Sequence, residues 1–381
     1  MVEVDGHVRF VKPENEADLS IGRDSSSWVN YDYRGKTFRE FTEEHREYEG
    51  NETINEIMLK LQLAAFPVLP HVVDKLYLAK KGGERLVLLP IDYPGSPTPT
   101  HEEVIRLMEA FPEQIIGAVS VNPNRGDAMA LLCEKLGEVI ALNERLGNGW
   151  RPVVKFHPLT QRFDPGNLGL KELVKMYALM DEVGAVLVTH TGVFQTTQVD
   201  DDIVIADPAR LIPVAERYQK MNIVLAHMGT PDMAVANWWA AKGVDVRHFD
   251  NALEMVGRYP HVYGDLGGLL WTGDRPQGVY GECERKFYYF GDRAHFGYSR
   301  VNSILEEEGK WKRLKRALGR EKKNPMGDKL LYGSDFPITH RDDLERQKGK
   351  LGGFNPAKNT GKVFRKPDVM GQVLPMKAAS R

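Results

Sequence analysis

The sequence alternates between short apolar runs and amphipathic segments, and this alternation constrains the fold more than any other feature. Continuous apolar runs are typical of parallel strands that are covered on both faces. Eight such runs are expected to form strands: Val2–Phe10, Arg85–Tyr93, Gln114–Pro123, Pro152–Pro158, Ala185–Gly192, Asn222–Gly229, His261–Gly267 and Lys329–Pro337. Helices are expected in most of the gaps: Asn51–Ala64, His101–Phe111, Asp127–Arg145, Leu170–Val183, Asp207–Lys220, Asp232–Tyr259 and Val301–Leu318.

Eight strand–helix units in succession predict one (β/α)8 TIM barrel, which we expect to span residues 1–340. An open, doubly wound α/β sheet is the alternative. No GxGxxG or Walker A motif follows any of the expected strands, and this weakens the alternative.

Two segments do not follow the alternation. Residues 12–50 form a long polar segment with several aromatic residues, and it follows the first strand. We expect this insertion to rise from the catalytic end of the barrel as a lid or a partner-binding element. Residues 341–381 are rich in lysine and arginine, and we expect a tail that packs on the barrel or on a neighbouring subunit of a homo-oligomer, such as a dimer.

Composition excludes several classes of protein. Hydrophobic residues make up 42% of the 381 residues, so a disordered chain is excluded. A net charge of -2 argues against a nucleic-acid partner, and no apolar run approaches the ~20 residues that span a membrane. Charged residues occupy the place of a signal peptide's apolar stretch, and Cys133 and Cys283 cannot form a disulfide framework. We therefore expect a cytoplasmic protein that acts on a small molecule.

Potential metal ligands occur at the ends of the expected strands, where a barrel has its active site. Four of the eleven histidines lie at the ends of strands one, four, five and six. Imidazole and carboxylate groups suit zinc, manganese or iron. Strand residues two apart point to the same side, so Lys155 and His157 share a direction. The candidates are Asp5, His7, Arg9, Lys155, His157, His190, His227 and Asp335, and Asp265 near the end of strand seven is expected to pair structurally or to support the ligands.

Five segments, in this order and at this spacing, resemble the amidohydrolase superfamily. They are VDGHVRF, VVKFHP, VLVTHTG, NIVLAHMG and LLYGSDFP, and the segment ADPARL before the sixth strand is also similar. The resemblance covers roughly residues 1–340, and within the superfamily it is to the amidohydrolase-related branch that includes aminocarboxymuconate semialdehyde decarboxylase.

The resemblance implies roles for the matching residues. His190 matches the metal-binding histidine of strand five, and Asp335 matches an aspartate of strand eight that binds metal and can take a proton. His227 matches a histidine of strand six that acts on the bound water or the substrate. His227 and Asp335 are thus the expected catalytic residues, and the expected cofactor is one divalent ion, zinc first, with manganese or iron as alternatives.

The first strand departs from the commonest pattern of the family, which is His-x-His. This chain has Asp5-Gly6-His7 followed by Arg9, and some decarboxylating members have an acidic residue, one spacer and a histidine here. We therefore expect Asp5 and His7 to bind the metal together with His190 and Asp335. In the other register Arg9 would take a ligand position, and because arginine cannot bind a cation that register implies a weak or absent metal.

Three functions follow from this interpretation. The first is a metal-dependent hydrolase in which activated water attacks a carbonyl-type substrate. The second is a metal-dependent, non-oxidative decarboxylase that uses the same site. The third is a non-catalytic barrel whose metal site has decayed. In the two catalytic cases Arg9, Lys155 and His157 are expected to contact the substrate. Arg9 is expected to anchor an anion, because a guanidinium group matches a carboxylate in a fork.

Overall fold

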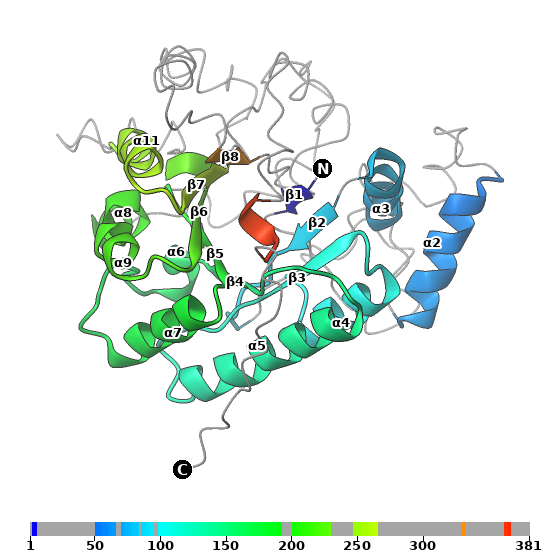
Figure 1. Ribbon diagram of the computed structural model, residues 1–381, viewed down its shortest axis with the longest axis horizontal. Coiled ribbons are helices and arrows are strands. Elements are labelled where there is room, and N and C mark those ends of the chain that lie inside the picture. Colours follow the sequence, from blue (N-terminus) through cyan, green and yellow to red (C-terminus); the bar gives the residue numbers. More distant parts are fainter. Residues whose placement is uncertain are drawn as a thin grey trace, which may run out of the picture.

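The computed structural model describes residues 2–5, 50–65, 70–83, 85–94, 98–192, 200–229, 247–265, 329–331 and 362–366 (Figure 1). The predicted insertion at residues 12–50, apart from residue 50, and most of the predicted tail lie outside this range. The predicted helix at Val301–Leu318 also lies outside it.

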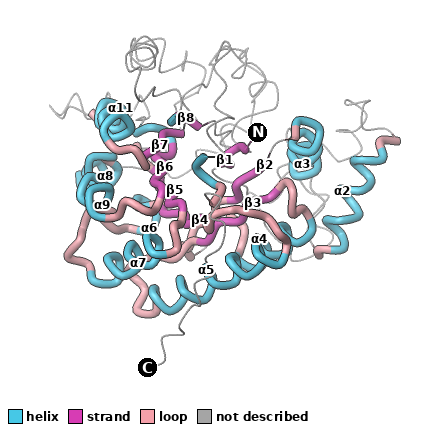
Figure 2. Tube along the Cα trace, viewed as in Figure 1, coloured by secondary structure: helices cyan, strands magenta, loops and turns pink. Residues whose placement is uncertain are grey.

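The strands form one parallel sheet in sequential order. They are β1 (Val2–Asp5), β2 (Arg85–Leu88), β3 (Ile115–Val119), β4 (Val153–Phe156), β5 (Val186–His190), β6 (Asn222–Ala226), β7 (Val262–Asp265) and β8 (Leu330–Leu331). Each strand pairs in parallel with the next one, from β1 to β8. Figure 2 shows the strands following one another along a curve with the labelled helices outside it. This arrangement confirms the predicted (β/α)8 TIM barrel.

The helices lie between successive strands. They are α2 (Glu52–Leu63), α3 (Pro70–Gly82), α4 (His101–Ala110), α5 (Ala128–Arg145), α6 (Pro158–Gln161), α7 (Lys171–Glu182), α8 (Asp200–Ala206), α9 (Ile212–Arg217) and α11 (His248–Arg258). Two short 3-10 helices, η4 (Pro208–Leu211) and η5 (His227–Gly229), complete the described elements.

Side chains along each strand alternate between two apolar clusters. In β5, Val186 and Val188 lie in the barrel interior, whereas Leu187 belongs to the layer between the sheet and the helices. Burial on both faces explains why the strand sequences are continuous apolar runs. The buried interior residues are Val87, Leu89, Ile116, Ala118, Trp150, Val153, Val186, Val188, Val224, Ala226, Leu331, Val363 and Phe364.

Helix α4 shows how a helix is placed against the sheet. It begins at a capping box in which Thr100 Oγ1 accepts from the backbone N–H of Glu103 and the Glu103 carboxylate accepts from the N–H of Thr100. Its buried side faces β3 so closely that a Cβ added to Gly117 would stand 2.2 Å from Met108 Sδ and 2.7 Å from Val104 Cγ1. Glycine at position 117 therefore allows the helix to pack directly on the strand.

Residues 362–366 cover the end of the barrel at which the strands begin, and Figure 1 shows this segment beside the strands. Val363 and Phe364 are fully buried in the interior cluster. The backbone N–H of Arg151 donates to Phe364 O at 2.7 Å, and Asn222 Nδ2 donates to Val363 O at 2.9 Å. This segment forms a floor under the described strands.

Helix prediction was wrong in two places. Helix α3 was not predicted, although its buried residues Val72, Val73, Leu76 and Tyr77 have helical spacing. The single helix predicted over Asp207–Lys220 is instead the short η4 followed by α9, and α8 precedes them. Proline occupies an early position of both η4 and α9, where it fixes the backbone but lacks the N–H that would continue one helix. The helix predicted over Asp232–Tyr259 is confirmed for its described part, α11.

Within the described residues, no helix is long and apolar enough to cross a membrane.

Candidate active site

Three histidines and a lysine come together at the carboxyl ends of β4, β5 and β6. Lys155 lies in β4, His157 follows that strand, His190 ends β5 and His227 directly follows β6. Lys155 is 0% exposed and His190 1% exposed, and the other two are also buried. Lys155 and His190 pair in register with interior residues of the next strand, so both lie on the interior face.

The three imidazole rings form a continuous group. The rings of His157 and His190 are parallel, with centroids 4.1 Å apart and an interplanar angle of 1°. The ring of His227 also lies next to that of His190. The centroids of these two rings are 4.9 Å apart, and their planes are tilted by 57°. The predicted residues from three different strands are therefore neighbours in space, as expected for groups that act on one small ligand.

His157 is held by the turn that follows it. Thr160 N–H donates to His157 Nδ1 at 3.3 Å, and the backbone N–H of His157 donates to Gln161 Oε1 at 2.8 Å. An Nδ1 atom that accepts a hydrogen bond carries no proton, so we assign the proton of the neutral ring to Nε2 from this pattern. His157 therefore presents a hydrogen-bond donor at Nε2.

Electrostatics favour the neutral form of His157. Burial lowers the pKa of the His157 imidazole well below its usual range, and the nearby Lys155 and His227 lower this pKa further. The ring is consequently uncharged near neutral pH and can act as a neutral donor.

His227 lies in an unusual backbone turn. His227, Met228 and Gly229 have φ values of 63°, 51° and 65°, so three consecutive residues adopt the left-handed conformation. This conformation is unfavourable for residues with a Cβ, and such strain persists only where surrounding contacts hold it. At Gly229 an added Cβ would stand 2.4 Å from His248 O, so glycine is needed there for space as well.

Thr191 supplies contacts that hold this turn. Its hydroxyl Oγ1 donates to Ala226 O at 2.7 Å and accepts from Gly229 N at 2.8 Å. The buried side chain thus connects the residues on either side of His227 and Met228. Because Thr191 directly follows His190, one short segment supplies both a candidate ligand and the support of the next candidate residue.

Asp265, the acidic candidate of strand seven, lies on the same sheet as these residues. It ends β7, is 3% exposed and pairs in register with the interior residue Leu331. Its side chain therefore lies on the interior face, and its expected role in structural pairing or in supporting the ligands stays a prediction.

The remaining predicted site residues cannot be placed with the histidines. His7, Arg9 and Asp335 lie outside the described residues, and Asp5 is described only as backbone at the end of β1, in register with Leu88. Their predicted roles as ligands, base and substrate contact stay predictions. Among the residues that the structure describes, no group of three or more His, Cys, Asp or Glu side chains is placed to hold a metal ion.

Imidazole nitrogens suit a divalent metal ion, and His190 is the described residue that is expected to bind it. Zinc binds imidazole nitrogen at about 2.0–2.1 Å, so two rings on one ion have centroids roughly 5 Å apart. The rings of His190 and His227 are 4.9 Å apart, a separation that also allows His227 to lie beside an ion without binding it. A divalent ion bound by His190 would therefore lie within reach of His227, and Asp5, His7 and Asp335 are the residues expected to complete its ligands.

Sequence reasoning missed the residues that support these histidines. Thr191 lies next to His190 and Gln161 lies four residues after His157, so proximity along the chain was the available signal. Ser120, at the end of β3, contacts Gln161 Nε2 at 3.2 Å, and no local pattern indicated this contact.

The family model described as amidohydrolase matches residues 95–365, which is more than half of the chain. The chain therefore belongs to the amidohydrolase family, as predicted. The match does not distinguish branches, so the resemblance to the branch that includes aminocarboxymuconate semialdehyde decarboxylase stays a prediction. Members of this family are generally metal-dependent enzymes. No curated protein sequence matches the chain.

Solved structures resemble the chain at low identity. An uncharacterised TIM-barrel protein from Bordetella bronchiseptica shares 12% identity over 95% of this chain and 98% of that chain, with a TM-score of 0.47. A probable 2-pyrone-4,6-dicarboxylic acid hydrolase from Acinetobacter baumannii shares 12% identity over 95% of this chain and 98% of that chain, with a TM-score of 0.43. A 2,6-dihydroxybenzoate decarboxylase from Rhizobium shares 12% identity over 96% of this chain and 95% of that chain, with a TM-score of 0.41.

Proposed function

We propose that this protein is a metal-dependent hydrolase that acts on a small molecule with a carbonyl-type scissile group. The observation that carries the proposal is the buried group formed by His190, His227, His157 and Lys155 at the carboxyl ends of neighbouring barrel strands. Membership of the amidohydrolase family supports the same assignment.

The proposed metal ligands are Asp5, His7, His190 and Asp335. A bound divalent ion polarises a carbonyl group and lowers the pKa of water towards neutrality. In this proposal, Asp335 accepts the proton of the attacking water and delivers it to the leaving group. His227 stabilises the developing oxyanion or moves a proton, and the left-handed turn fixes its position.

The proposed substrate contacts come from Lys155, His157 and Arg9. The Lys155 side chain is fully buried on the interior face beside the imidazoles, where it can contact a carboxylate of the substrate. The neutral His157 ring donates from Nε2 and so can bind a carboxylate or carbonyl oxygen. Both contacts favour a substrate that carries at least one carboxylate.

Buried Lys155 also supports a second candidate, the non-oxidative decarboxylation of a carboxylated substrate by the same residues. In that reaction Asp335 protonates the carbon from which carbon dioxide leaves. A panel of aromatic acids and of carboxylated esters and lactones separates the two reactions. Carbon dioxide as the product supports decarboxylation, whereas release of an acid with an alcohol supports hydrolysis.

Metal analysis of the purified protein tests the shared basis of both reactions. Protein purified without chelator is expected to contain about one divalent ion per chain, and His190→Ala is expected to lose it because a ligand is missing. His101→Gln is the matched control, since His101 bonds Glu138 between α4 and α5, away from the site. The proposal fails if H190A keeps the ion. It also fails if the natural protein binds no ion and its melting temperature does not change with zinc or manganese, an outcome that indicates a non-catalytic barrel.

A further inference from the structure

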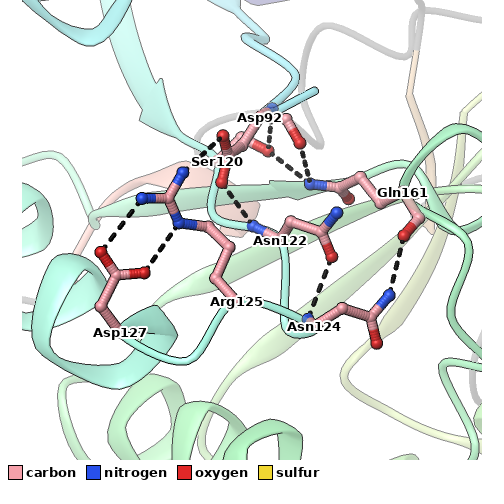
Figure 3. A network of polar contacts seen from close by, with 7 residues as sticks. All are labelled: Asp92, Ser120, Asn122, Asn124, Arg125, Asp127 and Gln161. Atoms are coloured by element: carbon pink, nitrogen blue, oxygen red, sulfur yellow. Dashed lines mark hydrogen bonds and ion pairs between the residues drawn. The ribbon is translucent and has the colours of Figure 1, made fainter. Parts of the chain in front are cut away.

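Gln161 joins three loops at the end of the barrel that carries the candidate site. Its amide Nε2 donates to Asp92 O at 3.3 Å and to Ser120 Oγ at 3.2 Å, and its Oε1 accepts from His157 N at 2.8 Å. Figure 3 shows the part of this network that connects the segments after β2 and β3 with α6. Gln161 is 1% exposed, so these bonds are made away from solvent.

The orientation of the Gln161 amide follows from its neighbours. The backbone N–H of His157 can only donate, so the atom facing it is oxygen. The carbonyl of Asp92 can only accept, so the atom facing it is nitrogen. Both partners require the same orientation, and neither a glutamate nor an apolar residue can satisfy both of them.

Gln161 and Thr160 hold His157 at three points. The His157 N–H donates to the Gln161 side chain, the His157 carbonyl accepts from Gln161 N at 2.8 Å, and His157 Nδ1 accepts from Thr160 N. The backbone and the ring of His157 are therefore fixed by one turn of helix. The same ring lies parallel to His190, so this turn also determines how the two imidazoles face each other.

Other polar residues support this turn from outside. The Asp92 carboxylate accepts from Asn122 N at 2.8 Å and lies 3.7 Å from Arg125 Nη1 (Figure 3). Asn124 Nδ2 donates to the backbone carbonyls of Gln161 and Arg162, each at 3.0 Å. Asn124 therefore touches the backbone of the turn without bonding His157, which makes it a matched control position.

We propose that Gln161 is a positioning residue for His157: by accepting from the His157 backbone N–H, it keeps the ring parallel to His190 with Nδ1 bonded to Thr160 and the donor at Nε2. The substrate contact of His157 rests on the function proposed above. The positioning itself does not depend on a bound metal or on turnover.

Nuclear magnetic resonance of histidine labelled with ¹⁵N in the ring tests this proposal, because long-range proton–nitrogen correlations report which ring nitrogen carries the proton. The His157 signals are identified by their loss in His157→Gln. We expect a single Nε2–H pattern in the natural protein. Gln161→Met is expected to lose this pattern and give a mixture of both tautomers, whereas Gln161→Glu keeps the acceptor oxygen and is expected to retain it.

Thermal unfolding and far-ultraviolet circular dichroism establish that each variant is folded before its signals are compared. Asn124→Ala loosens the turn without touching His157 and is expected to leave the His157 pattern unchanged. The proposal is overturned if folded Q161M keeps the natural pattern, if Q161E loses it as Q161M does, or if N124A changes it equally. The measurement uses metal-free protein, so a failed metal assignment leaves its outcome interpretable, and a changed tautomer says nothing for or against the metal.

Discussion

The conformation of His227 has an energetic cost that the surrounding residues must offset. A residue with a Cβ in the left-handed region loses roughly 1–2 kcal/mol, and both His227 and Met228 are in this region. The Thr191 hydroxyl bonds the backbone on both sides of the turn. Local strain at a buried histidine of the candidate site is the kind of feature that accompanies function.

Thr191→Val is expected to destabilise the protein by about 1–3 kcal/mol, because valine keeps the shape but leaves the buried Ala226 carbonyl and Gly229 N–H without their hydroxyl partner. Urea unfolding followed by circular dichroism measures the difference. Thr191→Ser keeps the hydroxyl and should lose less than half as much. Equal losses in the two variants would show that the methyl group, and not the hydroxyl, supports the turn.

At the scale of residues, the sequence predicted which histidines meet but not how they are held. His157, His190 and His227 could be found because the carboxyl ends of parallel strands meet at one end of a barrel. Gln161 and Thr191 could not, because their roles depend on turns whose geometry no short pattern specifies. Asp5, His7, Arg9 and Asp335 stay predictions.

At the scale of elements, the close packing of α4 on β3 depends on the absence of a side chain at Gly117. The helix face and the strand approach each other there without space for a methyl group. Glycines elsewhere in the chain have different surroundings, and Gly137 in α5 has nothing within 4 Å of an added Cβ.

Two glycine substitutions are therefore expected to have opposite effects. Gly117→Ala should lower the free energy of unfolding by about 1–3 kcal/mol, because its Cβ would overlap Val104 and Met108 and force the helix outward. Gly137→Ala should raise it by up to about 1 kcal/mol, because alanine favours helix and meets no neighbour. Denaturant titration of both variants gives the two values, and a loss in G137A as large as that in G117A would contradict this packing argument.

Element prediction succeeded where periodicity was strong and continuous. The described parts of all eight strands fall within the predicted runs, and α4, α5 and α7 match their predicted segments closely. It failed where several short helices share one connection. The segment from α8 to α9 is divided by prolines, and α3 lies in a connection to which a single helix had already been assigned.

At the scale of the whole molecule, the sequential parallel order of the strands was predictable from the repeated strand–helix unit. The floor formed by residues 362–366 was not, because two buried positions in a basic tail resemble any surface segment. Its partners Arg151 and Asn222 belong to distant strand–helix units, and only the folded barrel brings them together.

Phe364→Ala is expected to cost about 3–5 kcal/mol of stability, since the fully buried ring fills the barrel interior and its removal leaves a cavity there. Lys366→Ala is the control, because Lys366 is exposed and contacts Gly149 only through its backbone N–H. That variant should change stability by less than about 0.5 kcal/mol. A small loss in F364A, measured by the same urea titration, would mean that the floor contributes little to the fold.

The position of this floor also has a consequence for biosynthesis. Arg151 donates from its guanidinium to Arg365 O, a contact between residues separated by 214 positions. At a translation rate of about 5–20 residues per second, Arg151 is synthesised roughly 10–40 seconds before Arg365. During this interval residues 362–366 do not yet cover the apolar inner face, so the order of synthesis adds the floor only after all eight strands have been made.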